Sequence, residues 1–128
     1  MITFAHLLAV GAGAALGAIG RWLLGLWLNH SGAVLPWGTL AANGLGAYAI
    51  GLLLALVVQW PAAPDWLKLF MITGFLGGLT TFSTFSAETI GLLQRGDWLA
   101  ALGYAFISLA GSLALTALGF YSVQRVLA

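Results

Sequence analysis

Residues 74–86 read GFLGGLTTFSTFS, a stretch of three glycines and five hydroxyl side chains near the middle of a mostly apolar run. Glycine disfavours a helix interior by about 1 kcal/mol relative to alanine. Serine and threonine side chains also compete for backbone hydrogen bonds. We therefore predict a membrane-spanning helix that is broken near residues 77–80, with a tolerated kink between packed helices as the alternative.

The broken run is one of four long apolar segments. A membrane helix needs about 20 mostly apolar residues, and the segments that qualify are residues 4–28, 38–60, 66–94 and 98–124. The first lacks the basic start of a signal peptide, so we expect it to be retained. Tryptophans mark the segment ends, as in an aromatic belt at a membrane interface; they are Trp37, Trp60, Trp66 and Trp98. We predict a single all-α transmembrane domain over residues 1–128.

The composition supports a membrane protein and excludes several other classes. The chain has 128 residues, of which 62% are hydrophobic and only 5% are charged. A soluble domain carries roughly a quarter charged residues, so we expect the lipid bilayer to be the solvent of this chain. The net charge of +1 offers no nucleic-acid patch. Two histidines, three carboxylates and no cysteine leave little chemistry for an enzyme.

The positive charges do not choose an orientation in the membrane. With four spans, Lys68 and Arg125 fall on one side, while Arg21 and Arg95 fall on the other. An orientation rule needs an excess of Lys and Arg on one side. Because the two sides carry equal numbers of Lys and Arg residues, we expect dual topology and an antiparallel homodimer. The alternative is that the first helix or more distant features fix one orientation.

Small residues supply surfaces on which helices can approach closely. A bundle of four short helices is filled by its own side chains, so a conduction path is expected to need contact between subunits. Gly13 and Gly17, and likewise Ala14 and Ala18, form small-xxx-small pairs. These pairs could serve that contact or ordinary packing within one subunit.

The predicted break would expose backbone groups in the middle of the membrane. Unpaired carbonyls cannot face lipid, and freed carbonyls in transporters commonly bind a cation such as Na⁺. The second half-helix would present its N-terminus to the membrane centre, where its free N–H groups favour an anion.

Aromatic and amide side chains accompany the break. Phe82 and Phe85 share a helix face, which by itself indicates packing. The positive edge of an aromatic ring can also contact a small anion without trapping it. Asn43 adds an amide donor one turn after Thr39, although an interhelical hydrogen bond explains this pair equally well.

Hydroxyl side chains recur at every fourth residue of the fourth span. They are Tyr104, Ser108, Ser112 and Thr116. Successive hydroxyls could replace the water around a dehydrating anion. Adhesion between helices through Ser and Thr is the alternative.

Arg21 and Glu88 are ionisable residues within the spans, where such groups mark pathways or paired sites. Arg21 could attract anions into a vestibule, and Glu88 could orient its neighbours or take up protons. Either side chain could instead extend to the interface. We assign no function to His6 or His30.

The ordered motifs of the first three spans resemble the Fluc/CrcB fluoride channel family. They are residues 17–21, the run Gly38-Thr39-Leu40 followed by Asn43, and Gly77-Gly78 followed by TTFSTFS at residues 80–86. The resemblance covers essentially the whole chain, and it implies a passive fluoride channel. The resemblance further implies a dual-topology antiparallel dimer with two pores and one buried Na⁺ on the twofold axis.

The resemblance also implies roles for individual residues. The backbone oxygens of Gly77 and Thr80 from both subunits would hold Na⁺. The residues expected to line the pore and contact fluoride are Asn43, Phe82, Phe85, Tyr104, Ser108, Ser112 and Thr116, with Arg21 and Glu88 acting electrostatically near a vestibule. Supporting roles are expected for Thr39, Gly78, Thr81, Ser83 and Thr84. The expected task is fluoride resistance at a bacterial inner membrane.

Two other functions compete with this interpretation. A proton-coupled small multidrug exporter also uses four short helices and an antiparallel dimer, but it resembles a family with a carboxylate in the first span, and this first span has none. Only Glu88 could then couple protons. A membrane protein that forms an assembly without transport is the third possibility, and it predicts no ion flux.

Overall fold

The computed structural model describes all 128 residues and contains helices without strands. Four helices are long and apolar enough to cross a membrane; they are Phe4–Leu28, Trp37–Gln59, Asp65–Gln94 and Trp98–Leu127. The prediction of an all-α protein with four spans is thereby confirmed. The last helix continues to Leu127, beyond the predicted end at residue 124.

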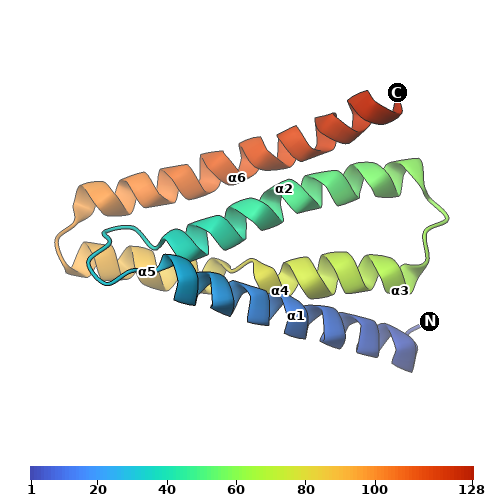
Figure 1. Cartoon of the computed structure of the whole chain (residues 1–128), viewed down its shortest axis with the longest axis horizontal. Coiled ribbons are helices and arrows are strands. Elements are labelled where there is room, and N and C mark those ends of the chain that lie inside the picture. Colours follow the sequence, from blue (N-terminus) through green and yellow to red (C-terminus); the bar gives the residue numbers. More distant parts are fainter.

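The helices run along one common axis (Figure 1). The first, second and fourth spans are α1 (Phe4–Leu28), α2 (Trp37–Gln59) and α6 (Trp98–Leu127). The third span consists of α3 (Asp65–Lys68), the π-helix η1 (Leu69–Leu76), α4 (Gly77–Leu79) and α5 (Phe82–Gln94). Both termini and the turn between α2 and α3 lie at one end of the molecule, and the other two connections lie at the opposite end.

The third helix is broken, as predicted. Thr80 (φ −88°, ψ 154°) and Thr81 (φ −150°, ψ 123°) adopt extended backbone conformations between α4 and α5. The two β-branched residues follow a glycine pair of low helix propensity, so the helix is weakest here. The preceding turns are already wound as a π-helix, a form that is rare and frequent at functional sites.

Glycines allow two pairs of helices to pack with their backbones in contact. A Cβ atom at Gly17 of α1 would lie 2.0 Å from the Phe75 carbonyl oxygen, and one at Gly78 would lie 2.4 Å from the Ala14 carbonyl oxygen. On the other side of the molecule, a Cβ atom at Gly51 of α2 would lie 2.1 Å from the Thr116 carbonyl oxygen of α6. The small residues of α1 therefore serve packing within one subunit, which was the alternative to subunit contact.

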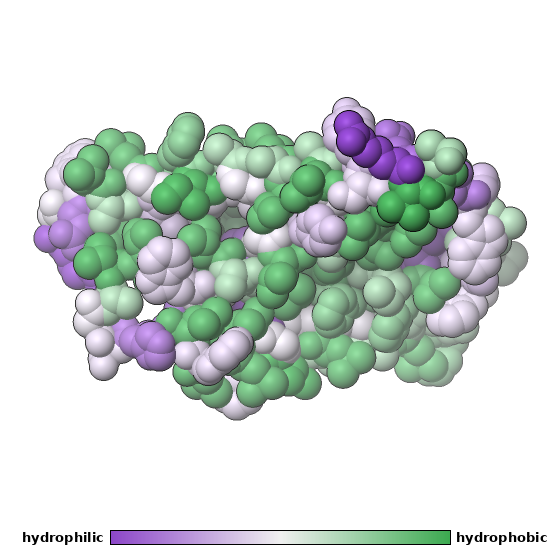
Figure 2. Space-filling view, turned by 45° about the horizontal axis from the view of Figure 1, so that its top comes forward, coloured by the Kyte–Doolittle hydropathy of each residue, from purple (hydrophilic) through white to green (hydrophobic).

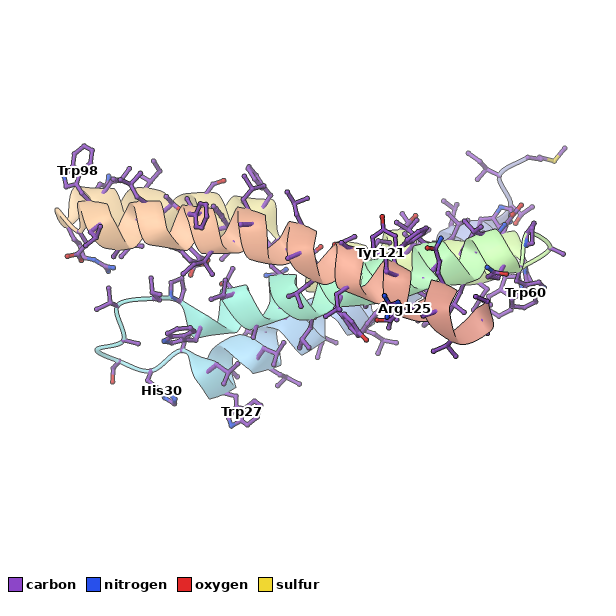
Figure 3. All side chains as sticks on the ribbon, turned by 90° about the horizontal axis from the view of Figure 1, so that it is seen from above. Trp27, His30, Trp60, Trp98, Tyr121 and Arg125 are labelled. Atoms are coloured by element: carbon purple, nitrogen blue, oxygen red, sulfur yellow. The ribbon has the colours of Figure 1, made fainter.

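The surface is that of a multi-pass membrane protein. Only 17 of 128 residues are buried, so most apolar side chains face outward. Hydrophobic residues cover the middle of the molecule, and hydrophilic residues gather towards its ends (Figure 2). Trp27 and Trp98 lie near one end and Trp60 near the other (Figure 3), as expected for aromatic anchors at two membrane interfaces.

Candidate functional site

A cavity of about 510 Å³ opens beside the break, between α2, the third span and α6. None of the side chains that line it is charged. Apolar residues such as Ile50 and Leu109 form much of its wall. The predicted site residues that the fold brings to this cavity are Asn43, Gly77, Thr80, Thr81, Phe82, Phe85, Ser108 and Ser112.

Asn43 of α2 holds the break open through both groups of its amide. The Thr81 N–H donates to Asn43 Oδ1 at 2.7 Å, and Asn43 Nδ2 donates to the Thr81 carbonyl at 3.1 Å. In a continuous helix the Thr81 N–H would bond to the Gly77 carbonyl. The interhelical hydrogen bond that the sequence left as an alternative is therefore present, and one N–H of the amide stays available beside the cavity.

Arg21 of α1 contacts the break from the side opposite to Asn43. Its Nε donates to the Gly78 carbonyl at 3.1 Å, so the guanidinium satisfies one of the freed carbonyls. The Thr80 hydroxyl donates back to the Leu76 carbonyl at 2.8 Å. Gly46 of α2 makes room for this turn, because a Cβ atom there would lie 2.2 Å from Thr80 Cγ2. No sequence pattern indicated this role of Gly46 beyond the small size of glycine.

The second half of the broken helix begins with a threonine cap. Thr81 Oγ1 accepts a hydrogen bond from the Thr84 N–H at 3.1 Å, the usual role of threonine before the first turn. Thr81 Oγ1 also lies 3.4 Å from the Ser83 hydroxyl. Thr81, Ser83 and Thr84 thus shape the start of α5, and Ser83 and Thr84 do not line the cavity.

Three aromatic rings form a chain that leads away from the cavity. Phe82 and Phe85 contact edge to face with their centroids 5.6 Å apart, and Phe85 contacts Tyr104 in the same way at 5.2 Å. Phe82 is 82% exposed, whereas Tyr104 is fully buried. Edge-to-face contacts direct the positive edge of one ring at its neighbour and fix the rotation of each ring.

Glu88 belongs to a polar group behind these rings. The Thr39 hydroxyl donates to Glu88 Oε1 at 2.7 Å. The buried Tyr104 hydroxyl forms no hydrogen bond within the chain. A buried hydroxyl without a partner is rare and calls for a functional explanation. These three residues do not line the 510 Å³ cavity.

The four hydroxyl residues of α6 separate into different environments. Ser108 and Ser112 line the cavity, and Tyr104 lies behind Phe85. The Thr116 hydroxyl donates to the Ala47 carbonyl of α2 at 2.9 Å. Thr116 therefore joins two helices, which was the alternative interpretation for this row. The regular spacing alone could not distinguish these environments.

A second, smaller cavity was not expected from the sequence. It has a volume of about 250 Å³ and lies between the loop of residues 29–36 and the second half of the broken helix. Its lining includes His30, Glu88 and Arg95. The position of an irregular loop against a helix cannot be predicted from local sequence patterns. The sequence therefore did not indicate that His30 and Arg95 share a cavity with Glu88.

The break also offers oxygen ligands for a cation. The Thr81 and Thr84 N–H groups, which would otherwise bond to the Gly77 and Thr80 carbonyls, bond to side chains instead. Carbonyl oxygens freed in this way are the donors that Na⁺ accepts in membrane transporters. The donor chemistry at Gly77 and Thr80 therefore fits Na⁺, although two carbonyls form only part of a coordination shell.

Comparison with known proteins places the whole chain in one family. Residues 8–120 match the family described as CrcB-like protein, Camphor Resistance (CrcB). A protein of Bordetella petrii named "Fluoride-specific ion channel FluC" is 62% identical over 121 residues, covering 94% of this chain and 93% of that protein. Proteins with the same name from Bordetella bronchiseptica and Bordetella avium are 57% identical over 129 residues and 61% identical over 119 residues. These matches cover 99% of each chain and 93% of each chain, respectively.

Proposed function

The chain belongs to the CrcB-like family, and on this premise we propose that it is a fluoride-selective passive ion channel. It is a transporter and not an enzyme. The observation that carries the proposal is the uncharged 510 Å³ cavity at the break, where Asn43, the Phe82 and Phe85 rings, and the Ser108 and Ser112 hydroxyls meet. The names of the relatives in Bordetella agree with this assignment.

The lining of the cavity suits an anion that must bind weakly and leave quickly. Hydroxyl and amide groups donate hydrogen bonds, and ring edges carry partial positive charge. Fluoride would exchange its water for these contacts one after another. Because no lysine or arginine lines the cavity, no fixed cation holds the ion. Conduction requires this balance between binding that permits entry and binding that permits exit.

We propose that the channel is an antiparallel homodimer with two pores. The support comes from exposed groups at the break. Gly77 is exposed, and its carbonyl has lost its helix partner. A bare carbonyl cannot face lipid, so this surface needs protein against it. Phe82, 82% exposed beside the cavity, would be covered by the same contact. The tie in positive charge between the two sides favours the antiparallel arrangement.

A Na⁺ ion on the twofold axis is part of the proposal. The Gly77 and Thr80 carbonyls of one subunit would hold it together with the same atoms of the second subunit. The bound cation would neutralise the carbonyl dipoles that the dimer buries at the membrane centre. Its role is structural, and it takes no part in moving fluoride. Removal of Na⁺ from the buffer is expected to weaken the dimer.

The biological task follows from the chemistry of fluoride in a bacterial inner membrane. Neutral HF crosses a bilayer, dissociates in a more neutral cytoplasm and leaves the anion trapped. A passive fluoride channel lets the trapped anion leave and reduces its toxicity. The apolar composition and the four helices long enough to span a membrane support a membrane location, and the relatives are bacterial proteins.

Two experiments test the proposed function. Bacteria that lack their own fluoride export should regain growth in fluoride medium when they express this chain, and failure to do so with protein present in the membrane would contradict the task. In proteoliposomes, fluoride should run down its gradient without a proton gradient. Uphill transport that requires a proton gradient and is abolished by Glu88→Gln would favour the exporter instead.

A further inference from the structure

The side chain of Thr73 is exposed within the apolar part of the third span, and its hydroxyl forms no hydrogen bond within the chain. Thr73 lies inside the π-helix η1, in the span that begins at Asp65. At 1.5 Å per residue it is about 12 Å from Asp65 along the helix axis. The hydrocarbon core of a bilayer is about 30 Å thick, so this hydroxyl lies where lipid tails offer no hydrogen bond.

The winding of η1 explains why the Thr73 hydroxyl is free. Inside an α-helix, a serine or threonine hydroxyl can donate to the carbonyl four residues earlier. Ser86, Thr89 and Ser122 of this chain all do so. Thr73 makes no such bond, because a π-helix pairs residues that are five apart and the carbonyl four residues earlier is not aligned with the side chain. The π-helix therefore leaves a hydroxyl donor available.

No helix of the same chain covers the face that carries Thr73. On one side of it, Gly74 is buried against α1, where a Cβ atom would lie 2.7 Å from the Val10 carbonyl oxygen. On the other side, Ile72 lines the 510 Å³ cavity. Gly77 follows Thr73 by about one helical turn, is also exposed, and has a carbonyl that has lost its helix partner. The open face thus presents a donor and an acceptor at membrane depth.

Resting on the antiparallel homodimer proposed above, we propose that Thr73 is a contact residue between the two subunits. Its hydroxyl forms a hydrogen bond with the start of α5 in the second subunit, where the Thr81 and Ser83 hydroxyls lie 3.4 Å apart. Twofold symmetry forms the same contact a second time. A lipid tail cannot take this place, because it has neither a donor nor an acceptor.

The register of two antiparallel third helices favours this partner. In the proposed dimer the twofold axis passes between the Gly77 and Thr80 carbonyls. Thr73 precedes this point by about 8 Å of helix. Ser83 follows it by about 10 Å, since Thr80 and Thr81 are extended and each adds about 3.3 Å. Because the second helix runs the other way, one subunit's Thr73 reaches nearly the same level as the other subunit's Ser83.

The absence of cysteine from the chain permits a direct test by cross-linking. The variant Thr73→Cys/Ser83→Cys is oxidised in membranes, and covalent dimers are measured on a denaturing gel. A disulfide requires Cα atoms within about 7 Å of one another, so the two cysteines of one chain are too far apart along the helix to pair. Thr73→Cys/Ile90→Cys is the matched control, because Ile90 is 54% exposed and lies about 10 Å beyond Ser83 along α5.

Most of the Thr73→Cys/Ser83→Cys protein should become a covalent dimer, and the control pair should remain monomeric on the gel. Each single-cysteine variant should also stay monomeric, because equivalent residues lie on opposite sides of the axis. No covalent dimer from the double variant, with wild-type protein that is dimeric and carries fluoride, would overturn the inference and leave the proposed function standing. A covalent dimer from Thr73→Cys alone would indicate parallel subunits and would overturn the antiparallel dimer as well.

The affinity between subunits provides an independent readout of the hydroxyl itself. Dimer dissociation is measured in liposomes by energy transfer between subunits labelled at their N-termini. Thr73→Val should raise the dissociation constant about tenfold, since two interhelical hydrogen bonds are lost per dimer. Thr73→Ser keeps the hydroxyl and should restore the wild-type value to within about twofold. Thr89→Val is the matched control, because that hydroxyl already donates to the Phe85 carbonyl at 2.8 Å, and it should have no effect.

A hydroxyl that faced lipid would give the opposite result. Replacing it with an apolar group would then leave the dissociation constant unchanged or lower it, because no partner is lost and the side chain suits the hydrocarbon better. Equal dissociation constants for Thr73→Val and Thr89→Val would therefore overturn the contact between subunits. If wild-type protein neither dimerised nor carried fluoride, the proposed function itself would fail.

Discussion

The two sides of the broken helix differ in how they meet their neighbours. Towards α1, glycines bring backbones into direct contact, and a Cβ atom at Gly17 would lie 2.0 Å from a carbonyl oxygen. Towards α2 and α6, the same segment leaves a cavity of about 510 Å³ lined by hydroxyl groups, rings and an amide. The comparison indicates that close packing on one side fixes a helix whose other side stays open for an ion.

The largest expected effect on stability comes from adding a side-chain atom at the close contact between α1 and the third span. Gly17→Ala should destabilise the fold by about 3 kcal/mol or more, because the new methyl group meets backbone atoms that cannot move aside. Gly11→Ala on the same helix has no atom within 4 Å of the new Cβ and should be neutral or slightly stabilising. Thermal unfolding in detergent measures both. Equal melting temperatures for the two variants would contradict close packing at Gly17.

The second-largest effect on stability should follow from replacing the Asn43 side chain, whose amide bonds to the backbone at the break. Asn43→Leu leaves the Thr81 N–H and carbonyl without partners in a water-poor site, which should cost about 2 to 4 kcal/mol. Fluoride efflux should fall with the loss of the break geometry. Unfolding and efflux are measured on the same preparation. A variant with wild-type stability and efflux would show that the two hydrogen bonds do not hold the break.

The aromatic rings should affect flux more than stability. Phe82→Ile and Phe85→Ile should each lower fluoride efflux about tenfold, equivalent to about 1.4 kcal/mol, while the dimer survives. Phe120→Ile is the matched control, because Phe120 makes the same edge-to-face contact with Tyr121 at 5.6 Å outside the cavity. Unchanged efflux in both cavity variants would remove these rings from the mechanism.

The smallest effect should distinguish free from engaged hydroxyls on α6. Ser112→Ala removes a hydroxyl from the cavity wall and should lower fluoride efflux about two- to fivefold, equivalent to about 0.4 to 1 kcal/mol. Ser122→Ala removes a hydroxyl that donates to the Leu118 carbonyl at 2.5 Å and should leave efflux unchanged. Equal efflux in the two variants would contradict a hydroxyl contribution from the cavity.

The fold could be predicted from the sequence because lipid imposes strong local rules. Long apolar runs, turn formers and terminal tryptophans gave four spans, and the glycine pair with TTFSTFS gave the break. Whether Gly17 contacts the third helix or another subunit could not be predicted, because spacing identifies a small surface without its partner. In the structure that partner is the third helix.

The candidate site was predictable only at the level of residue types. Asn43, Phe85 and Ser112 do meet at one cavity. Their sequence spacing could not reveal that both amide groups of Asn43 bind Thr81, or that the Arg21 guanidinium binds the Gly78 carbonyl. These contacts join residues far apart in the chain, and they depend on where each helix sits against the break.

Anion efflux from liposomes tests the central claim most directly. Purified protein is reconstituted into liposomes loaded with fluoride or with chloride, ionophores clamp the voltage, and electrodes record the ion that leaves. The account predicts rapid fluoride efflux and negligible chloride efflux. Equal efflux of the two ions, or no efflux from folded protein, would contradict a fluoride-selective pore at the break.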